Sequence, residues 1–265
     1  MDEVPKSIFI TGAASGMGRE TATLFASKGW FVGAYDVDQA GLDSLNAEIG
    51  DHGLFELLDV ADLGAFGVAM ARFGGATRGT LDLMFNNAGV GAGGLLDEQP
   101  WDEIKRIIDI NLIGVIIGAR AAIPLLRNTP GSLLLNMSSS SAIFGTAGIS
   151  IYSATKHAVR GLTEALSIEL KRYGVRAADL LPGLIDTPLL SDPVRSMAPA
   201  DGMWRLIAPS AVAEVVWQAY ASDKLHWYIP DELRDFHAQV VREPEVVREE
   251  RTELLAAMLG QAPTS

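Results

Sequence analysis

Short apolar segments alternate with longer amphipathic segments along most of this chain, and this alternation restricts the fold more than any other feature. Six short apolar runs flanked by turn residues are expected to be strands: Ser7–Thr11, Phe31–Asp36, Leu54–Leu58, Leu81–Asn86, Ser132–Met137 and Val175–Leu181. Segments with apolar residues at threefold and fourfold spacing lie between them and are expected to be helices: Gly16–Lys28, Gln39–Ile49, Leu63–Phe73, Trp101–Leu126 and Tyr152–Tyr173. Strands that are apolar on both faces and alternate with helices predict a doubly wound α/β domain, with a parallel sheet covered on both sides.

Composition excludes several classes of function. The chain has no cysteine, so a thiol nucleophile, a disulfide framework and a thiolate metal site are all ruled out. Its net charge of -12 opposes binding to nucleic acid. The four histidines lack the spacing of metal ligands, and we expect no metal. The start, MDEVPKSIFI, does not resemble a targeting segment, and no apolar stretch reaches the ~18 residues of a membrane span, so we expect a cytoplasmic protein.

No composition break marks a second domain, and residues 1–265 are expected to form one domain. Residues of about 187–209 carry prolines and methionines among few charges, which favours a mobile substrate lid. Met197, Met203 and Trp204 in this segment either line a pocket or belong to the core. The tail, about residues 231–259, is rich in charge and is expected to be helical.

A glycine-rich turn, TGAASGMG, follows the first expected strand and opens the first helix. Glycines at such a junction let the backbone approach a pyrophosphate, while the helix N-terminus offers unpaired N–H groups and a positive dipole end. Gly12, Gly16 and Gly18 have this placement. The turn therefore predicts a dinucleotide site on a Rossmann-like sheet, although a tight turn alone also explains the glycines.

Asp36 ends the second expected strand, 24 residues after Gly12. A carboxylate there can accept hydrogen bonds from an adenosine ribose and repels a 2′-phosphate. Ser15 and Val37 stand nearby in place of a basic residue. We therefore expect NAD as the cofactor, with a plain turn residue as the other explanation for Asp36.

Tyr152 and Lys156 are four residues apart near the start of an expected helix, so their side chains share one face. A phenol with its ordinary pKa of about 10 is a poor base at neutral pH, and a neighbouring cation would stabilise its phenolate. Ser139 follows the strand Ser132–Met137, where a hydroxyl can hold a substrate oxygen. Each feature taken alone also fits a surface pair or a polar loop.

Taken together, these residues resemble the short-chain dehydrogenase/reductase family in its single-domain branch. The resemblance extends from about Ser7 to Leu190 and its motifs follow the family's order: TGAASGMG, Asp36, Asp59-Val60, NNAG at Asn86–Gly89, Asn111 in DINLIG, NMSS before YSATK, and PGLIDTP at Pro182–Pro188. The three-residue gap between Gly12 and Gly16 is typical of this branch.

The resemblance implies a role for each matching residue. It implies that the catalytic residues are Asn111, Ser139, Tyr152 and Lys156, with Asn111 linking Lys156 to solvent through a water. It implies adenine contacts from Asp59 and Val60, a wall beside the adenosine ribose from Asn87 to Gly89, and carboxamide contacts from Ile185 and Thr187. The full set implied to bind the cofactor is Gly12, Ser15, Gly16, Met17, Gly18, Asp36, Asp59, Val60, Asn87, Ala88, Gly89, Tyr152, Lys156, Pro182, Gly183, Ile185 and Thr187.

The C-terminal region departs from the family pattern. Many relatives end in a glycine-containing strand, and we expect the charged tail 231–259 to replace it here. The two longest helices, Trp101–Leu126 and Tyr152–Tyr173, carry more apolar residues than one buried stripe needs. These features favour a homodimer built on the two helices, with a homotetramer as the alternative.

The expected function is reversible hydride transfer between NAD and a secondary alcohol or ketone. Phe144, Ile149, Leu184, Leu189 and Met197 would make an apolar pocket, which favours a steroid-, terpenoid-, aryl- or fatty-alcohol-like substrate over a sugar or hydroxy acid. The alternatives are an NADPH-linked carbonyl reductase and a catalytically silent NAD-binding regulatory protein.

Overall fold

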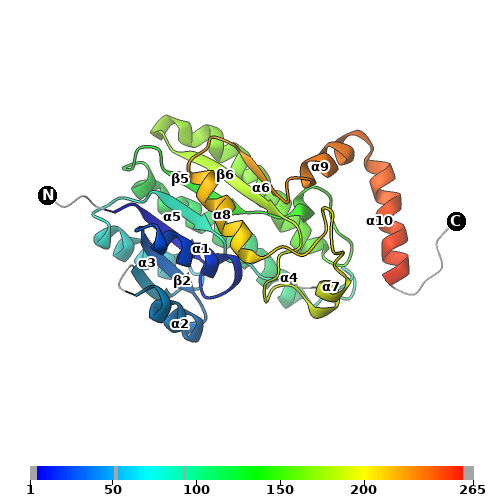
Figure 1. The fold of residues 1–265 in the computed structure, drawn as a ribbon, viewed down its shortest axis with the longest axis horizontal. Coiled ribbons are helices and arrows are strands. Elements are labelled where there is room, and N and C mark those ends of the chain that lie inside the picture. Colours follow the sequence, from blue (N-terminus) through cyan, green and yellow to red (C-terminus); the bar gives the residue numbers. More distant parts are fainter. Residues whose placement is uncertain (1–4, 51–52, 92, 259–265) are drawn as a thin grey trace.

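The computed structural model describes residues 5–50, 53–91 and 93–258, and a parallel sheet lies at its centre (Figure 1). Seven strands lie in the order β3-β2-β1-β4-β5-β6-β7. Their bounds are β1 Ser7–Thr11, β2 Phe31–Asp36, β3 Gly53–Leu57, β4 Leu83–Asn86, β5 Leu133–Met137, β6 Arg176–Pro182 and β7 His226–Ile229. The chain builds outward from β1 in both directions, so the expected doubly wound fold of one domain is confirmed.

Helices cover both faces of the sheet with apolar side chains. The helices α1, α2 and α8 pack on one face, and α3, α5 and α6 pack on the other. The bounds are α1 Gly16–Ser27, α2 Gln39–Ile49, α3 Leu63–Ala76, α4 Trp101–Ile108, α5 Gly114–Leu126, α6 Ser150–Glu169, α7 Asp192–Met197, α8 Pro209–Tyr220, α9 Leu233–Arg242 and α10 Pro244–Met258. The apolar side chains of the sheet and of these helices form two buried clusters, one on each face of the sheet.

The segment Trp101–Leu126 is one continuous run whose middle, Asp109–Ile113, is a π-helical turn between α4 and α5. Among the described residues, this run is long and apolar enough to cross a membrane by length and composition. However, 44% of its most apolar window is buried within the fold, and α5 packs against β4, β5 and α3. Contacts of this kind are typical of a helix that covers the core of a folded domain.

The expectation that the tail replaces the closing strand is wrong. β7 pairs in parallel with β6 and forms one edge of the sheet, so the sheet has one strand more than the six predicted. Its sequence, HWYI, mixes polar and aromatic residues and lacks the apolar run of the inner strands. An edge strand has one pairing neighbour and a partly exposed face, which explains why its pattern is weak.

The tail forms α9 and α10, and a third apolar cluster holds these helices to the body. This C-terminal cluster consists of buried Ile143, Leu181, Leu233, Phe236 and Val247, with Phe144, Met203, Trp204, Tyr228 and Val240 packed around them. Val247 of α10 is fully buried in it. Met203 and Trp204 therefore belong to this cluster, whereas Met197 is largely exposed.

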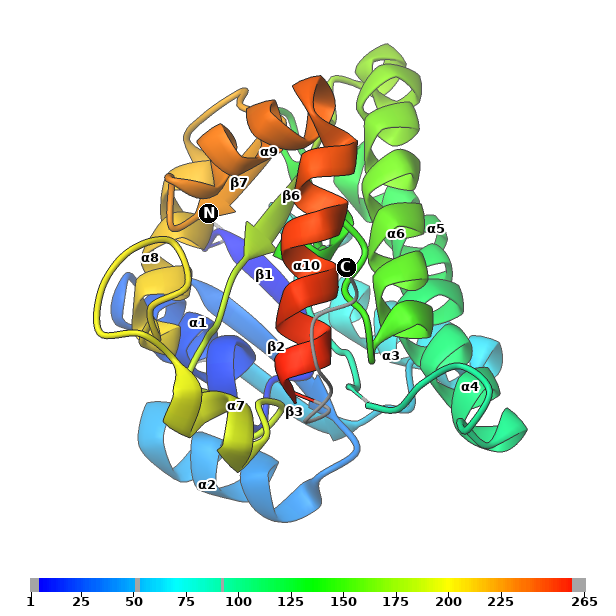
Figure 2. The same ribbon diagram turned by 90° about the vertical axis from the view of Figure 1, so that its right-hand side faces the viewer.

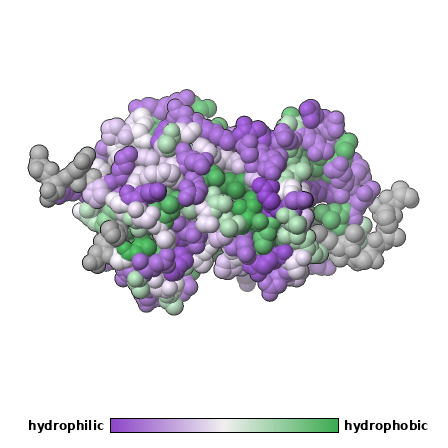
Figure 3. Space-filling model, viewed as in Figure 1, coloured by the Kyte–Doolittle hydropathy of each residue, from purple (hydrophilic) through white to green (hydrophobic). Residues whose placement is uncertain are grey.

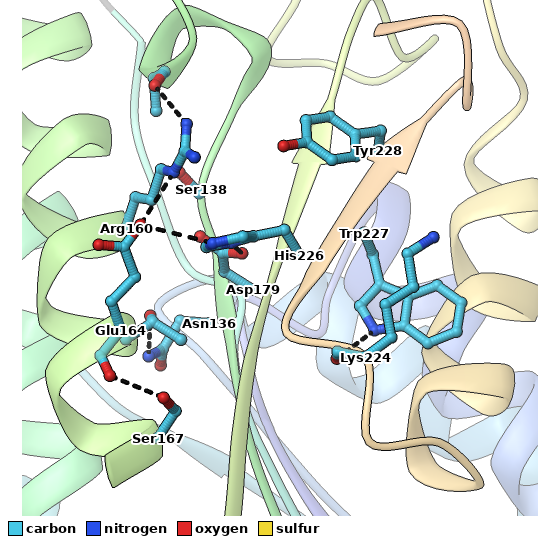
Figure 4. A network of polar contacts seen from close by, with 12 residues as sticks. Asn136, Ser138, Arg160, Glu164, Ser167, Asp179, Lys224, His226, Trp227 and Tyr228 are labelled. Atoms are coloured by element: carbon cyan, nitrogen blue, oxygen red, sulfur yellow. Dashed lines mark hydrogen bonds and ion pairs between the residues drawn. The ribbon is translucent and has the colours of Figure 1, made fainter. Parts of the chain in front are cut away.

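A row of polar residues crosses the sheet inside the fold. Asn86, Asn136, Asp179 and His226 are register partners on β4, β5, β6 and β7. The Asn86 amide donates to Asn136 Oδ1 at 2.9 Å, and His226 Nδ1 lies 2.7 Å from Asp179 Oδ1. Figure 4 shows His226 beside Asp179, with Arg160 of α6 approaching from the neighbouring helix. Burial raises the pKa of the Asp179 carboxyl, and the His226 partner lowers it in part.

Candidate active site

A cleft opens at the edge of the sheet where the strands end. Figure 2 views the molecule from the side of that edge. Predicted cofactor and catalytic residues from separate parts of the chain meet there. The lining consists of Gly12, Ser15, Gly16, Met17, Asp36, Val37, Leu58, Asp59, Val60, Asn87, Ala88, Gly89, Val90, Ile110, Met137, Ser138, Tyr152, Lys156, Pro182, Thr187, Pro188 and Leu189. In doubly wound folds, ligands bind at this edge, at the point where the strand order reverses.

The glycine-rich turn is packed so tightly that larger side chains do not fit. Gly12 has a φ of +68°, and a Cβ on Gly18 would lie 2.0 Å from the Gly12 carbonyl oxygen. Gly18 therefore stands behind the turn, where it lets α1 approach β1, and not in the cleft lining. The exposed backbone of the turn at the start of α1 is shaped to receive a pyrophosphate.

Thr11 holds this turn to the loop after β4, a role that the motif alone did not reveal. Its Oγ1 accepts hydrogen bonds from the backbone N–H groups of Asn87 and Ala88, each at 3.0 Å. The Asn87 side-chain amide donates in return to the carbonyls of Thr11 at 2.9 Å and Gly12 at 3.0 Å. Asn87 thus positions the two loops as well as lining the cleft.

Asp36 lies at the other end of the cleft, where its carboxylate is fixed by backbone donors. Oδ2 accepts from the Ala14 N–H at 2.9 Å, and Oδ1 accepts from the Val37 N–H at 2.7 Å. Arg19, on the first turn of α1, points away, since its guanidinium pairs with Glu48 at 2.6 Å. Among the described residues that line the cleft, Lys156 is the one that carries a positive charge, and it lies at the catalytic end.

Tyr152 and Ser139 approach each other from α6 and from the end of β5. Burial raises the pKa of the Tyr152 phenol, and a hydrogen bond with the Ser139 side chain opposes that rise. The Ser139 Oγ also accepts from the Ser141 N–H at 3.1 Å, which fixes its orientation. The pair can hold one oxygen atom of a ligand and exchange a proton with it.

Lys156 is almost fully buried, with 2% of its surface exposed. Its Nζ donates to the Met137 carbonyl at 2.9 Å and lies 5.4 Å from the centre of the Tyr152 ring. Burial lowers the pKa of the Lys156 ammonium to about 8. The sequence spacing placed the two side chains on one face but carried no signal for this desolvation.

Asn111 lies on the π-helical turn and is fully buried. Its Oδ1 accepts from the Val90 N–H at 2.8 Å, and its Nδ2 donates to the Val90 carbonyl at 2.9 Å. A Cβ on Gly89 would lie 3.3 Å from Asn111 Oδ1 and 3.6 Å from Lys156 Nζ, so these groups share one corner. Single π turns are common at functional sites, where the extra residue redirects a side chain.

Five predicted residues lie close to the cleft but not in its lining: Gly18, Asn111, Ser139, Gly183 and Ile185. Gly183 packs close to the Ile229 and Met203 carbonyls, and the Ile185 side chain is buried in the core, where its backbone bridges to Ile207. Thr187 does line the cleft and lies close to Gly16. Within the described residues, no cluster of three His, Asp or Glu side chains could hold a metal, and His52 lies outside that part of the chain.

The doubly wound sheet, the glycine-rich turn after β1 and the cleft at the carboxyl edge together form the arrangement of dinucleotide-binding domains. A family model described as short chain dehydrogenase matches residues 6–197. The chain therefore belongs to the short-chain dehydrogenase family, as its motifs had suggested.

Individual relatives agree with this assignment. The chain is 35% identical over 197 residues to a trans-4-hydroxycyclohexanecarboxylate dehydrogenase of Sinomonas cyclohexanicum, covering 69% of this chain and 74% of the relative. It is 33% identical over 191 residues to a 3-alpha-(or 20-beta)-hydroxysteroid dehydrogenase of Mycobacterium bovis, covering 70% and 71%. A 3-ketoacyl-(acyl-carrier-protein) reductase of Brucella melitensis, solved with NADH, superposes with a TM-score of 0.77 at 30% identity, covering 86% of this chain and 98% of that structure.

Proposed function

We propose that this protein is an NAD-dependent oxidoreductase that transfers hydride reversibly between nicotinamide and a secondary alcohol or ketone. The observation that carries the proposal is the meeting of Tyr152 and Lys156 at one end of a cleft whose other end holds the Asp36 carboxylate, with Ser139 directly beside the Tyr152 phenol. The backbone of the glycine-rich turn, which lines the cleft at Gly12 and Gly16, fits a dinucleotide pyrophosphate.

NAD held by the glycine-rich turn and Asp36 would supply the hydride acceptor for alcohol oxidation and, when reduced, the hydride donor for ketone reduction. Tyr152 takes the alcohol proton in oxidation and gives it back in reduction. Ser139 holds the substrate oxygen beside the phenol. The Lys156 ammonium stabilises the phenolate and holds the nicotinamide ribose, and Asn111 keeps the Val90 loop in place beside Lys156.

A catalytically silent NAD-binding regulator is the rival from another class. The presence of both Tyr152 and Lys156 in the cleft argues against it, because a binding protein gains nothing from burying a lysine beside a phenol. Incubating the protein with NAD and a panel of secondary alcohols, and following absorbance of the reduced cofactor, separates the two. Binding of NADH without turnover of any alcohol or ketone would favour the regulator.

The choice of NAD over NADP rests on Asp36. A 2′-phosphate placed against this carboxylate would meet a like charge, and Arg19 is already paired with Glu48. We expect kcat/KM for NAD to exceed that for NADP by at least about 100-fold, since like-charge contacts cost several kcal/mol. Steady-state kinetics with both cofactors measures the ratio.

The variant Asp36→Ala should narrow this ratio, whereas Asp43→Ala, which removes an exposed acid on α2, should leave it unchanged. Equal kcat/KM for the two cofactors in the unmodified enzyme would instead support the NADPH-linked carbonyl reductase.

The substrate is proposed to be a cyclic or otherwise bulky secondary alcohol with an apolar body. The C-terminal cluster lies next to the catalytic end, because Leu181 directly precedes Pro182 of the cleft and Ile143 follows the Ser139 turn. Two relatives whose names specify a hydroxysteroid and a hydroxycyclohexanecarboxylate substrate support this class.

We propose a homodimer that pairs α5 and α6 with their copies. Ile113, at the end of the π-helical turn, is 40% exposed, Ile116 on α5 is 39% exposed, and Ile168 on α6 is 74% exposed. Apolar side chains at that exposure gain free energy when a second copy covers them. Because β7 is present, the absence of a closing strand no longer argues against a tetramer, which stays the alternative.

Light scattering after size exclusion is expected to give twice the 28.2 kDa mass of one chain. The variant Ile116→Glu should shift the mass toward that of one chain, because it places a charge in the proposed interface. Val68→Glu, at an exposed apolar position on α3, serves as the control. A single-chain mass for the unmodified protein would refute the dimer, and a fourfold mass would establish the tetramer.

A further inference from the structure

Arg251 of α10 lies against two aromatic side chains. Its guanidinium carbon is 4.8 Å from the centre of the Trp204 ring and 5.3 Å from that of Phe236. The two rings contact each other at 5.6 Å with an interplanar angle of 76°. A planar guanidinium on aromatic faces is held in one place while its N–H donors stay available at its edge.

These donors have no protein acceptor among the described residues. No ion pair or side-chain hydrogen bond in that part of the chain involves Arg251, whereas Arg248, one turn earlier, pairs with Glu249 at 2.8 Å. Arg251 is half-buried, and burial lowers the pKa of its guanidinium while the neighbouring Glu250 opposes this. A partly desolvated cation without an acceptor gains free energy when an anion binds it.

The aromatic pair is continuous with the catalytic end of the cleft. Trp204 and Phe236 belong to the C-terminal cluster, together with Ile143 and Leu181. A Cβ on Gly183 would lie 3.5 Å from the Met203 carbonyl, so the segment before Trp204 packs directly on the chain that leaves the cleft.

The figures agree with this placement. Figure 2 shows α10 crossing in front of the edge where the strands end, between α7 and α6, and Figure 1 shows it beyond that same edge. In Figure 3, hydrophobic residues gather near the centre of the face, between α8 and the helices α9 and α10.

We infer that Arg251 binds a carboxylate at the end of the substrate remote from the reacting carbinol carbon. This inference rests on the proposed function and narrows its substrate class to secondary alcohols with an apolar body and a distal carboxylate. Such a compound is a hydroxy acid, which the sequence had disfavoured. The reason for the change is the Arg251 guanidinium, which has no acceptor among the described residues. The guanidinium fork matches the two oxygens of a carboxylate, and the apolar cluster suits the hydrocarbon between the two ends. Glu250 and the net charge of -12 favour a singly charged group over a phosphate dianion.

Arg251 lies beyond residue 197, where the match to the family model ends. The inference therefore depends on a segment that the family model does not match.

The first experiment compares a cyclohexanol that bears a carboxylate with its methyl ester as substrates for the enzyme and NAD. For Arg251→Gln, we expect KM for the acid to rise by about 10- to 100-fold, the effect of losing a charge-assisted hydrogen bond, with kcat within about twofold. KM for the ester should not change. The control Arg248→Gln, which breaks an exposed ion pair on the same helix, should leave both substrates unaffected.

Equal KM values for acid and ester in the unmodified enzyme would overturn the inference. The same conclusion would follow if Arg251→Gln raised both KM values equally, because a residue that only anchors α10 would affect the two substrates alike.

A binding measurement separates this inference from the proposed function. Calorimetry of cyclohexanecarboxylate and cyclohexanecarboxamide with the NADH-saturated protein requires no turnover. The inference is supported if the protein binds the carboxylate but not the carboxamide, and if Arg251→Gln abolishes binding of the carboxylate. This result stands even if no alcohol is oxidised. In that case the proposed function fails and the inference does not. If the enzyme oxidises neutral alcohols but binds neither compound, the proposed function stands and the inference is wrong.

Discussion

Replacing Tyr152 with phenylalanine is expected to lower kcat for alcohol oxidation by about 10²–10⁴-fold, the usual contribution of a positioned acid–base group. The phenol is the group in the cleft that lies beside both Ser139 and Lys156. Phenylalanine keeps the ring and its packing and removes the hydroxyl alone. Steady-state oxidation of the best alcohol from the panel measures the loss.

Binding of NADH, followed by fluorescence titration, should change little in Tyr152→Phe, because the ring still fills its place in the lining. Tyr173→Phe is the matched control, since Tyr173 lies just beyond the same helix and is 38% exposed. A Tyr152→Phe enzyme that kept more than about a tenth of the original kcat would show that another group moves the proton.

Replacing Lys156 with methionine is expected to abolish turnover and to stabilise the cofactor-free fold near pH 7. Burial lowers the pKa of this ammonium from its usual 10.5 to about 8, so below pH 8 the folded state bears a charge that the unfolded state solvates better. The difference corresponds to roughly 3 kcal/mol. Loss of the hydrogen bond to the Met137 carbonyl offsets about 1 kcal/mol of this.

The gain in stability from Lys156→Met should depend on pH. The lysine penalty is complete below pH 8, decreases as pH rises toward 10.5 and vanishes above it, because both states are then neutral. Thermal unfolding should therefore show Lys156→Met melting roughly 4–8 °C higher at pH 7, with a gap that shrinks by pH 10. Lys171→Met, at an exposed position beyond α6, should show no such trend. A Lys156→Met protein that melts lower at pH 7 would contradict the prediction.

The inner strands were predictable because they are buried on both faces and hence read as apolar runs. β1 and β2 have the predicted bounds, β4 and β5 begin two residues and one residue later than predicted, and β6 is shifted by one residue at both ends. The glycine-rich turn and Asp36 were also predictable, since backbone approach and charge restrict the residue types allowed there. These are local requirements, and a local pattern can reveal them.

Features that depend on distant parts of the chain were missed. The π turn at Asn111 preserves the apolar character of its helix and gives no signal in the periodicity. The role of Thr11 depends on backbone donors after β4, and the burial of Lys156 depends on the elements that cover it. β7 was missed because it is held in the sheet by its pairing with β6, whereas its own residues lack the apolar run of a buried strand.

The polar row from Asn86 to His226 has a consequence for how the strands align while the protein folds. Parallel strands rich in Leu, Ile and Val can slide past one another at little cost, because one apolar side chain replaces another. A slip of β5 by one residue would instead turn Asn136 to the opposite face, away from both Asn86 and the Thr163 hydroxyl that it bonds at 2.9 Å. The amide would then be buried among apolar helices without a partner, at a cost of about 1–3 kcal/mol. The buried polar residues in the middle of this sheet thus specify the register of its strands, which the neighbouring apolar residues do not.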